Sequence, residues 1–161
     1  MNIIYSYTKL QLIITLILFV LQLSCKKHID WVNYNEIEIV RSSRDSTFYF
    51  RGKLFDGEIK KIDKKGDVML NFNVKNGRLS GEYFELYNNG NLKINSNYLE
   101  GKLNGKFISY FKNKNVNEET FYRNGLINGS RKLYWSNGAI KESSKLKLGV
   151  ITGECLFFYS N

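Results

Sequence analysis

The chain of 161 residues is long enough for one ordinary domain, and its 11 Tyr, 11 Phe and 2 Trp favour β-strands. It contains no Pro, which argues against a proline-rich linker or a disordered tail. The formal net charge of +9 favours anionic neighbours such as phospholipid headgroups or acidic glycans, although solubility alone would also account for it.

Residues 1–24 are predicted to be a cleavable secretory signal. Lys9 precedes an almost wholly apolar run over residues 10–23, and a small residue, Ser24, follows this run. The run of about 14 residues is short for a bilayer span of about 20, so a transmembrane anchor is the weaker alternative. The mature chain would keep 137 residues, with 23 basic and 15 acidic side chains.

Ser24-Cys25 at the end of the apolar run resembles a bacterial lipobox, although Gln22 stands where this motif usually has leucine. The resemblance implies that the Cys25 thiol is acylated and that Cys25 becomes the new N-terminus. Acyl chains would hold the protein at a membrane of the bacterial cell envelope, with Lys26 and Lys27 beside the headgroups.

Residues 25–49 are expected to form a tether and an N-terminal capping hairpin. Residues 36–40 alternate like a strand, residues 47–50 look like a second strand, and the polar segment 42–46 between them is typical of a turn. The tether would cover residues 26–34.

Residues 50–161 repeat with a period of 24. In a first series of glycines, neighbours are 24 residues apart throughout. In a second series, the first two glycines are 25 residues apart and the others 24. Each glycine of a third series lies nine residues after a glycine of the first series. The members are Gly57, Gly81, Gly105, Gly129 and Gly153; Gly52, Gly77, Gly101, Gly125 and Gly149; and Gly66, Gly90 and Gly138. Lys114 takes the vacant place in the third series, where a turn is still expected.

Each unit is predicted to be one β-hairpin. Asn89-Gly90 and Asn137-Gly138 between aromatic-rich runs predict type I′ turns, and the Gly-x-x-x-Gly segments predict slightly longer turns. Apolar side chains on both strand faces favour a narrow sheet, in which the rings at 87, 111, 135 and 159 touch only through the strand between. The predicted fold is all-β, an elongated single-layer antiparallel meander of about five 24-residue hairpin repeats.

The repeat resembles the bacterial variant form of the MORN family. The resemblance rests on the Gly-x-x-x-Gly pair, aromatic pairs such as Tyr134-Trp135, the Asn-Gly turn, and Leu92-Lys93 or Ile140-Lys141 after it. It covers residues 50–161 and implies an elongated chain of β-hairpins. Members of this family are described as antitoxins of toxin–antitoxin systems, as lipid-binding proteins or as scaffolds.

The sequence contains no recognisable catalytic set. The one histidine, His28, precedes the repeats, so a Ser-His-Asp or Cys-His arrangement is not expected, and neither a cofactor nor a metal site is predicted. Cys155 falls in a repeating strand position and is expected to be a small buried residue. Nucleic acid is not an expected partner, because the repeat register explains the aromatic residues.

The last unit ends in an apolar run that is predicted to be an unpaired edge strand over 154–159. This strand suggests an edge-strand homodimer or strand addition to another protein. The candidate partner-binding residues are Tyr87, Phe111, Trp135, Phe157 and Tyr159. The predicted function is a nonenzymatic, membrane-anchored binding or scaffold protein whose partner is a protein or an anionic surface. The alternative is an antitoxin or immunity-type protein that neutralises a toxin by direct binding.

Overall fold

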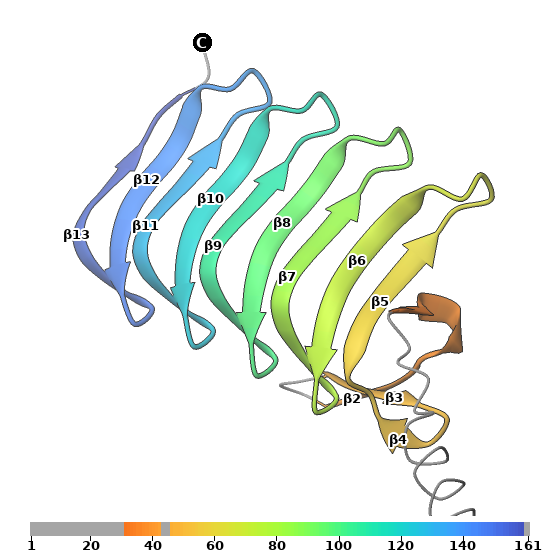
Figure 1. The fold of residues 1–161 in the computed structure, drawn as a ribbon. Helices are drawn as coiled ribbons and strands as arrows, with labels where there is room; N and C mark the ends of the chain where they lie inside the picture. The colour runs from red at the N-terminus through yellow and green to blue at the C-terminus, as the bar shows by residue number, and fades with distance from the viewer. Residues whose placement is uncertain (1–30, 43–45, 160–161) are drawn as a thin grey trace, which may run out of the picture.

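The protein is a long open β-sheet with a small second sheet against one end (Figure 1). The computed structural model describes residues 31–42 and 46–159. The large sheet has ten strands in the order β1-β5-β6-β7-β8-β9-β10-β11-β12-β13, and the small sheet has the order β2-β3-β4. The predicted signal segment and Cys25 lie outside the described residues.

Strands β5 to β13 form an uninterrupted antiparallel meander, which confirms the predicted fold class. Every strand after β5 has eight or nine residues and pairs with the strands before and after it in the chain, except the last. The bounds are β5 (Gly57–Ile62), β6 (Val68–Lys75), β7 (Arg78–Leu86), β8 (Leu92–Leu99), β9 (Lys102–Tyr110), β10 (Val116–Arg123), β11 (Leu126–Tyr134), β12 (Ile140–Lys147) and β13 (Val150–Phe157).

The two rows of turns have the opposite geometries to those predicted. At the Asn-Gly segments the loops have three residues: the Gly90 amide donates to the Tyr87 carbonyl, the Tyr87 amide donates to the Asn91 carbonyl, and only Gly90 of the loop has positive φ. The type I′ turns lie in the other row, where both central residues have positive φ, as at Glu100-Gly101. Asn-Gly occurs in both rows, so the dipeptide alone could not distinguish them.

These two rows run along opposite ends of the strands (Figure 1). We call residues 75–78, 99–102, 123–126 and 147–150 the two-residue rim, and residues 63–67, 87–91, 111–115 and 135–139 the three-residue rim. Lys114 occupies the vacant glycine place at φ 75°, and its amide donates to the Phe111 carbonyl. The expected turn is therefore present, with lysine in a left-handed conformation.

The N-terminal segment forms a cap over the first strands of the large sheet. Its elements are β1 (Trp31–Asn33), the 3-10 turn η1 (Tyr34–Glu36), β2 (Glu38–Arg41), β3 (Ser46–Phe50) and β4 (Lys53–Leu54). β1 pairs in parallel with β5, so residues 31–33 belong to the sheet rather than to the expected tether. The predicted hairpin is present as β2–β3, and residues 50–54 extend it, so the large sheet's meander begins at Gly57 rather than at residue 50.

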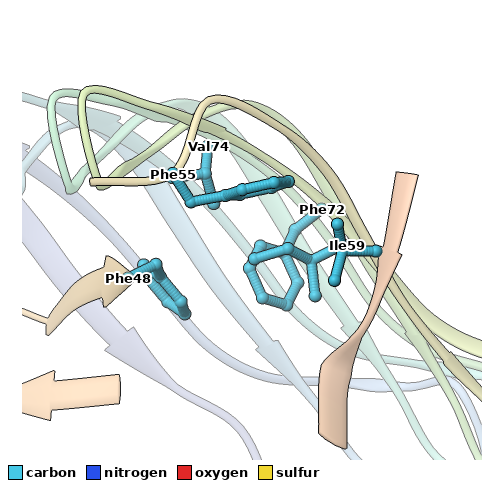
Figure 2. Close-up of a cluster of buried hydrophobic side chains, with 6 residues drawn as sticks. Phe48, Phe55, Ile59, Phe72 and Val74 are labelled. Carbon is cyan, nitrogen blue, oxygen red and sulfur yellow. The ribbon is translucent and has the colours of Figure 1, made fainter. Parts of the chain in front are cut away.

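The hydrophobic core lies between this cap and the first strands of the large sheet (Figure 2). The Phe48 ring comes from β3 and lies 5.2 Å from the ring of Phe72 on β6. Ile59 is completely buried beside them. Among residues 31–42 and 46–159, the buried hydrophobic side chains are Val32, Phe48, Phe55, Ile59, Phe72 and Val74.

Beyond the cap, the same face of the sheet carries small polar side chains at the positions that repeat Phe72. Ser96 and Thr120 have no exposed surface, and Ser144 is nearly as buried. Aromatic pairs cover the first two: the Tyr83 and Tyr98 rings lie 5.7 Å apart, and the Phe107 and Tyr122 rings 6.0 Å apart. A single layer suffices here because neighbouring strands shield these small residues.

Candidate interaction surfaces

Three of the predicted partner-binding residues lie at the three-residue rim and are half-buried. Tyr87, Phe111 and Trp135 follow directly after strands β7, β9 and β11. The Tyr87 hydroxyl donates to the Tyr110 carbonyl at 2.7 Å, and the Trp135 indole N–H donates to the Phe158 carbonyl at 3.3 Å. The Tyr87 and Trp135 side chains thus reach the backbone of the following repeat directly, through hydrogen bonds that the sequence did not indicate.

Asparagine side chains reinforce the same rim. The side-chain Nδ2 atom of Asn91 donates to the Lys112 carbonyl at 2.9 Å, and the side-chain Nδ2 atom of Asn115 donates to the Ser136 carbonyl at 2.8 Å. Each bond joins one turn to the turn of the following repeat. The three-residue rim thus uses its aromatic and amide groups to hold successive hairpins together, which leaves them less free to bind a partner.

The two-residue rim presents basic and aliphatic side chains to solvent. It contains five basic residues and one acidic residue, Glu100, whereas the three-residue rim contains four basic and two acidic residues. Four aliphatic side chains on the two-residue rim are about half exposed or more: Leu99, Leu126, Leu148 and Val150. No large hydrophobic side chain of the three-residue rim is exposed. The combination of basic side chains with exposed aliphatic side chains therefore distinguishes the two-residue rim from the other end of the strands.

Contacts between successive turns fix the spacing of the two-residue rim. The Asn104 side-chain oxygen accepts from the Asn124 amide at 3.2 Å, and that of Asn128 accepts from the Leu148 amide at 3.3 Å. The aliphatic stem of Lys102 lies over Gly125 in the next turn. The row of cations and leucines is therefore a regular edge carried by the sheet. Sequence reasoning missed it, because cationic and aliphatic side chains exchange places from repeat to repeat, as at Lys75, Leu99, Arg123 and Lys147, so neither kind alone keeps the 24-residue period.

Acidic side chains on the sheet itself are largely engaged by bases. Glu119 lies 2.5 Å from the Lys106 ammonium group, and the hydrogen bond from Lys106 lowers the pKa of Glu119. Arg131 lies 2.6 Å from Glu142 and 3.6 Å from Glu118. These pairs reduce the negative field of the strands and leave the basic rim as the dominant charge along that end.

The remaining predicted residues, Phe157 and Tyr159, lie at and just beyond the end of β13, which has β12 as its single neighbour among the described strands. Phe157 is 71% exposed and Tyr159, just beyond the strand, is 96% exposed. Val150, Ile151, Leu156 and Phe158 are also exposed. Cys155, which was expected to be buried, is half-buried because the strand has no second neighbour to cover it. An edge strand is therefore present, but it covers Val150–Phe157 rather than the predicted residues 154–159.

The described part of the chain holds no group of three or more His, Cys, Asp or Glu side chains that could bind a metal ion. In those residues there is also no helix of the length and apolarity needed to cross a membrane. Comparison with known protein families gives no match to this chain, and no curated protein is detectably similar to it in sequence.

Proposed function

We propose that the protein is a nonenzymatic binding module of the bacterial cell envelope, held at a membrane by acylated Cys25 and contacting an anionic surface through its two-residue rim. The observation that supports this proposal best is the combination of basic and exposed aliphatic side chains on that rim. Basic groups attract anionic headgroups, and aliphatic side chains between them can enter the boundary between headgroups and acyl chains.

The size of the expected attraction follows from the number of cations. A basic residue near an anionic leaflet contributes about 1 kcal/mol at moderate ionic strength, and this contribution is screened beyond the Debye length. Lys102, Arg123 and Lys147 come from three successive turns, so a flat surface can meet them together. Their combined contribution is about 3 kcal/mol, which corresponds to about a hundred-fold in partitioning.

Vesicle partitioning tests this proposal. The full chain is compared with a variant carrying Lys102→Gln, Arg123→Gln and Lys147→Gln, on vesicles of phosphatidylglycerol with phosphatidylethanolamine and on vesicles of phosphatidylcholine alone. The ratio of anionic to neutral partitioning is the readout, because the apolar N-terminal segment contributes to both. We expect the substitutions to lower this ratio by about a hundred-fold.

The matched control removes three cations from the other end of the strands: Lys64→Gln, Lys65→Gln and Lys112→Gln. This variant has the same net charge as the first, so we expect its ratio to stay within a few-fold of that of the unaltered chain. Equal losses in both variants would show nonspecific attraction to net charge and would exclude a membrane-facing rim.

The anchor is tested separately by the mass of the N-terminus after expression in bacterial cells. We expect an acylated fragment that begins at Cys25, and its loss in the presence of a lipoprotein signal peptidase inhibitor or in a Cys25→Ser variant. An unlipidated chain beginning at Met1 in the soluble fraction would contradict anchoring. The antitoxin-like alternative would then become the leading hypothesis.

A further inference from the structure

Strand β13 presents unsatisfied backbone groups along its outer side. The Phe158 amide donates inward to the Lys141 carbonyl at 2.9 Å, and β13 pairs with β12 without a shift from Cys155 to Phe157. Because backbone groups of an antiparallel strand point alternately to its two sides, those of Cys155 and Phe157 point to the free side. Solvent or another strand must satisfy them.

The same strand exposes an unusual amount of apolar surface. Phe157, Phe158 and Tyr159 are 71%, 45% and 96% exposed, and an aromatic side chain buries about 150–250 Å² when it is covered completely. The three rings therefore offer about 400 Å², roughly half of the 800 Å² that each partner contributes to a typical stable interface. Val150, Ile151 and Leu156 enlarge this surface. The apolar surface of β13 and the residues after it therefore exceeds half of what one partner contributes to a stable dimer.

The free edges available in a second copy favour β13 itself as the partner. Within the described residues, the other edge strands are β1, β2 and β4, which have three, four and two residues. β13 has eight, so β13 of a second copy is the one described free edge long enough to pair with more than four of its residues. Such pairing is isologous and closes as a dimer, whereas pairing of β13 with β1 would continue into a filament.

Charge then restricts the register. Glu154 is the only charged residue of β13, and a symmetry axis at Glu154 would bring the two carboxylates directly opposite each other. An axis one residue further along pairs Glu154 with Leu156 of the second copy and Gly153 with Phe157. This register places the free backbone groups of Cys155 in the two copies opposite each other and pairs residues 153–157 of both strands. It brings the two Cys155 side chains face to face.

We propose that two copies of the chain associate through antiparallel pairing of β13 with β13, with the symmetry axis at Cys155. The dimer is one continuous sheet across the junction, with the Phe157 and Tyr159 rings of each copy covering the strand of the other. The cations of the two-residue rim are not part of this pairing, because they lie at the ends of other strands rather than on the free side of β13.

Thiol cross-linking tests both the association and the register. In a full-length Cys25→Ser chain in nonionic detergent, Cys155 is the one remaining thiol. Residues directly opposite in antiparallel strands lie about 5 Å apart, and those on the diagonal about 7–8 Å apart. A bismaleimide with a span on the order of 8 Å should therefore yield a covalent dimer. Light scattering without cross-linker should give twice the monomer mass of 18.8 kDa.

Two variants on the strand and one elsewhere decide the outcome. Phe157→Lys and Tyr159→Lys should each weaken dimerisation at least ten-fold and abolish the cross-link; Tyr159 is almost fully exposed, so its substitution leaves the fold intact. Phe121→Lys, at an exposed ring on the interior strand β10, should change neither.

A monomer at every concentration, or a dimer unaffected by both strand variants, would overturn the proposal. If the mass from light scattering rises above that of a dimer as the protein concentration increases, the chain forms a filament and the proposed closed dimer is wrong. Neither result would bear on vesicle binding, since the rim residues are unaltered in all these chains.

Discussion

A side chain added at residue 77 would collide with its surroundings. A Cβ atom there would lie 2.6 Å from the Leu54 Cδ2 atom and 3.1 Å from the Phe48 carbonyl oxygen. At Gly52, which has almost the same φ, nothing lies within 4 Å of the corresponding position. Substitution of Gly52 by alanine therefore measures the cost of a left-handed backbone alone. The same substitution at Gly77 measures this cost together with that of the steric clash.

We expect Gly52→Ala to lower the free energy of unfolding by about 1 kcal/mol, the ordinary cost of left-handed backbone for alanine. Gly77→Ala should lower it by a further 1–2 kcal/mol, roughly, because the cap must shift away from the turn. Denaturant unfolding followed by tryptophan fluorescence measures both. If both substitutions lower the free energy of unfolding equally, the cap moves away from the added methyl group at residue 77 at no energetic cost.

Lys114 is the residue at which the turn pattern departs from glycine while keeping a positive φ of 75°. We expect Lys114→Gly to raise the free energy of unfolding by about 0.5–1 kcal/mol, because relief of the left-handed conformation exceeds the added chain entropy. Lys112→Gly in the same turn, where φ is negative, should lower it by about 0.5–1 kcal/mol. Destabilisation by both substitutions would contradict this account of the turn.

Among the elements, the cap is where hydrophobic packing is concentrated. Phe48 on β3 is 5% exposed and packs against Phe72. Phe48→Ala should destabilise the protein by about 3–5 kcal/mol, as expected for removal of a buried ring. Phe121→Ala, which removes a ring that is 43% exposed from β10, should cost about 1 kcal/mol or less. If Phe48→Ala and Phe121→Ala destabilise the protein by similar amounts, the packing of Phe48 in the cap contributes little more to stability than the partly exposed Phe121 does.

The period of the sequence predicted the elements of the array better than those of the cap. Glycines and apolar residues at intervals of 24 were sufficient to place the hairpins of β5–β13 and the free edge of β13. Nothing local marks the parallel pairing of Trp31 with Glu58, because it joins segments 27 residues apart with no repeat to relate them. The type of each turn also escaped prediction, since Glu100 and Leu148 carry no signal for the left-handed conformation that they adopt.

The candidate site was predictable only in part, for a related reason. Exposure of Phe157 and Tyr159 follows from the missing neighbour of β13. The basic rim depends on which end of each strand carries Lys102 or Leu126, which becomes visible only when the hairpins are aligned in space. The half-buried state of Tyr87 depends on a hydrogen bond to the following repeat.

In the molecule as a whole, stability should decrease from the cap toward β13. In the part of the chain that the structure describes, the buried hydrophobic side chains all lie between residues 32 and 74, whereas the later strands rely on neighbours and small buried polar groups. Amide hydrogen exchange should therefore be slowest in β5–β7 and fastest in β12 and β13. Uniform protection along the sheet would show that the whole array unfolds as one cooperative unit.

The order in which the core is completed has a consequence for biosynthesis. Strands β1 to β7, with every buried hydrophobic side chain of the described chain, are contained in residues 31–86. Each later hairpin pairs with the strand that immediately precedes it. A growing chain can thus fold from its N-terminal end while the rest is still being made, and each new hairpin finds a finished template. Among the described strands, the one with a long unpaired edge, β13, is therefore the last to be synthesised.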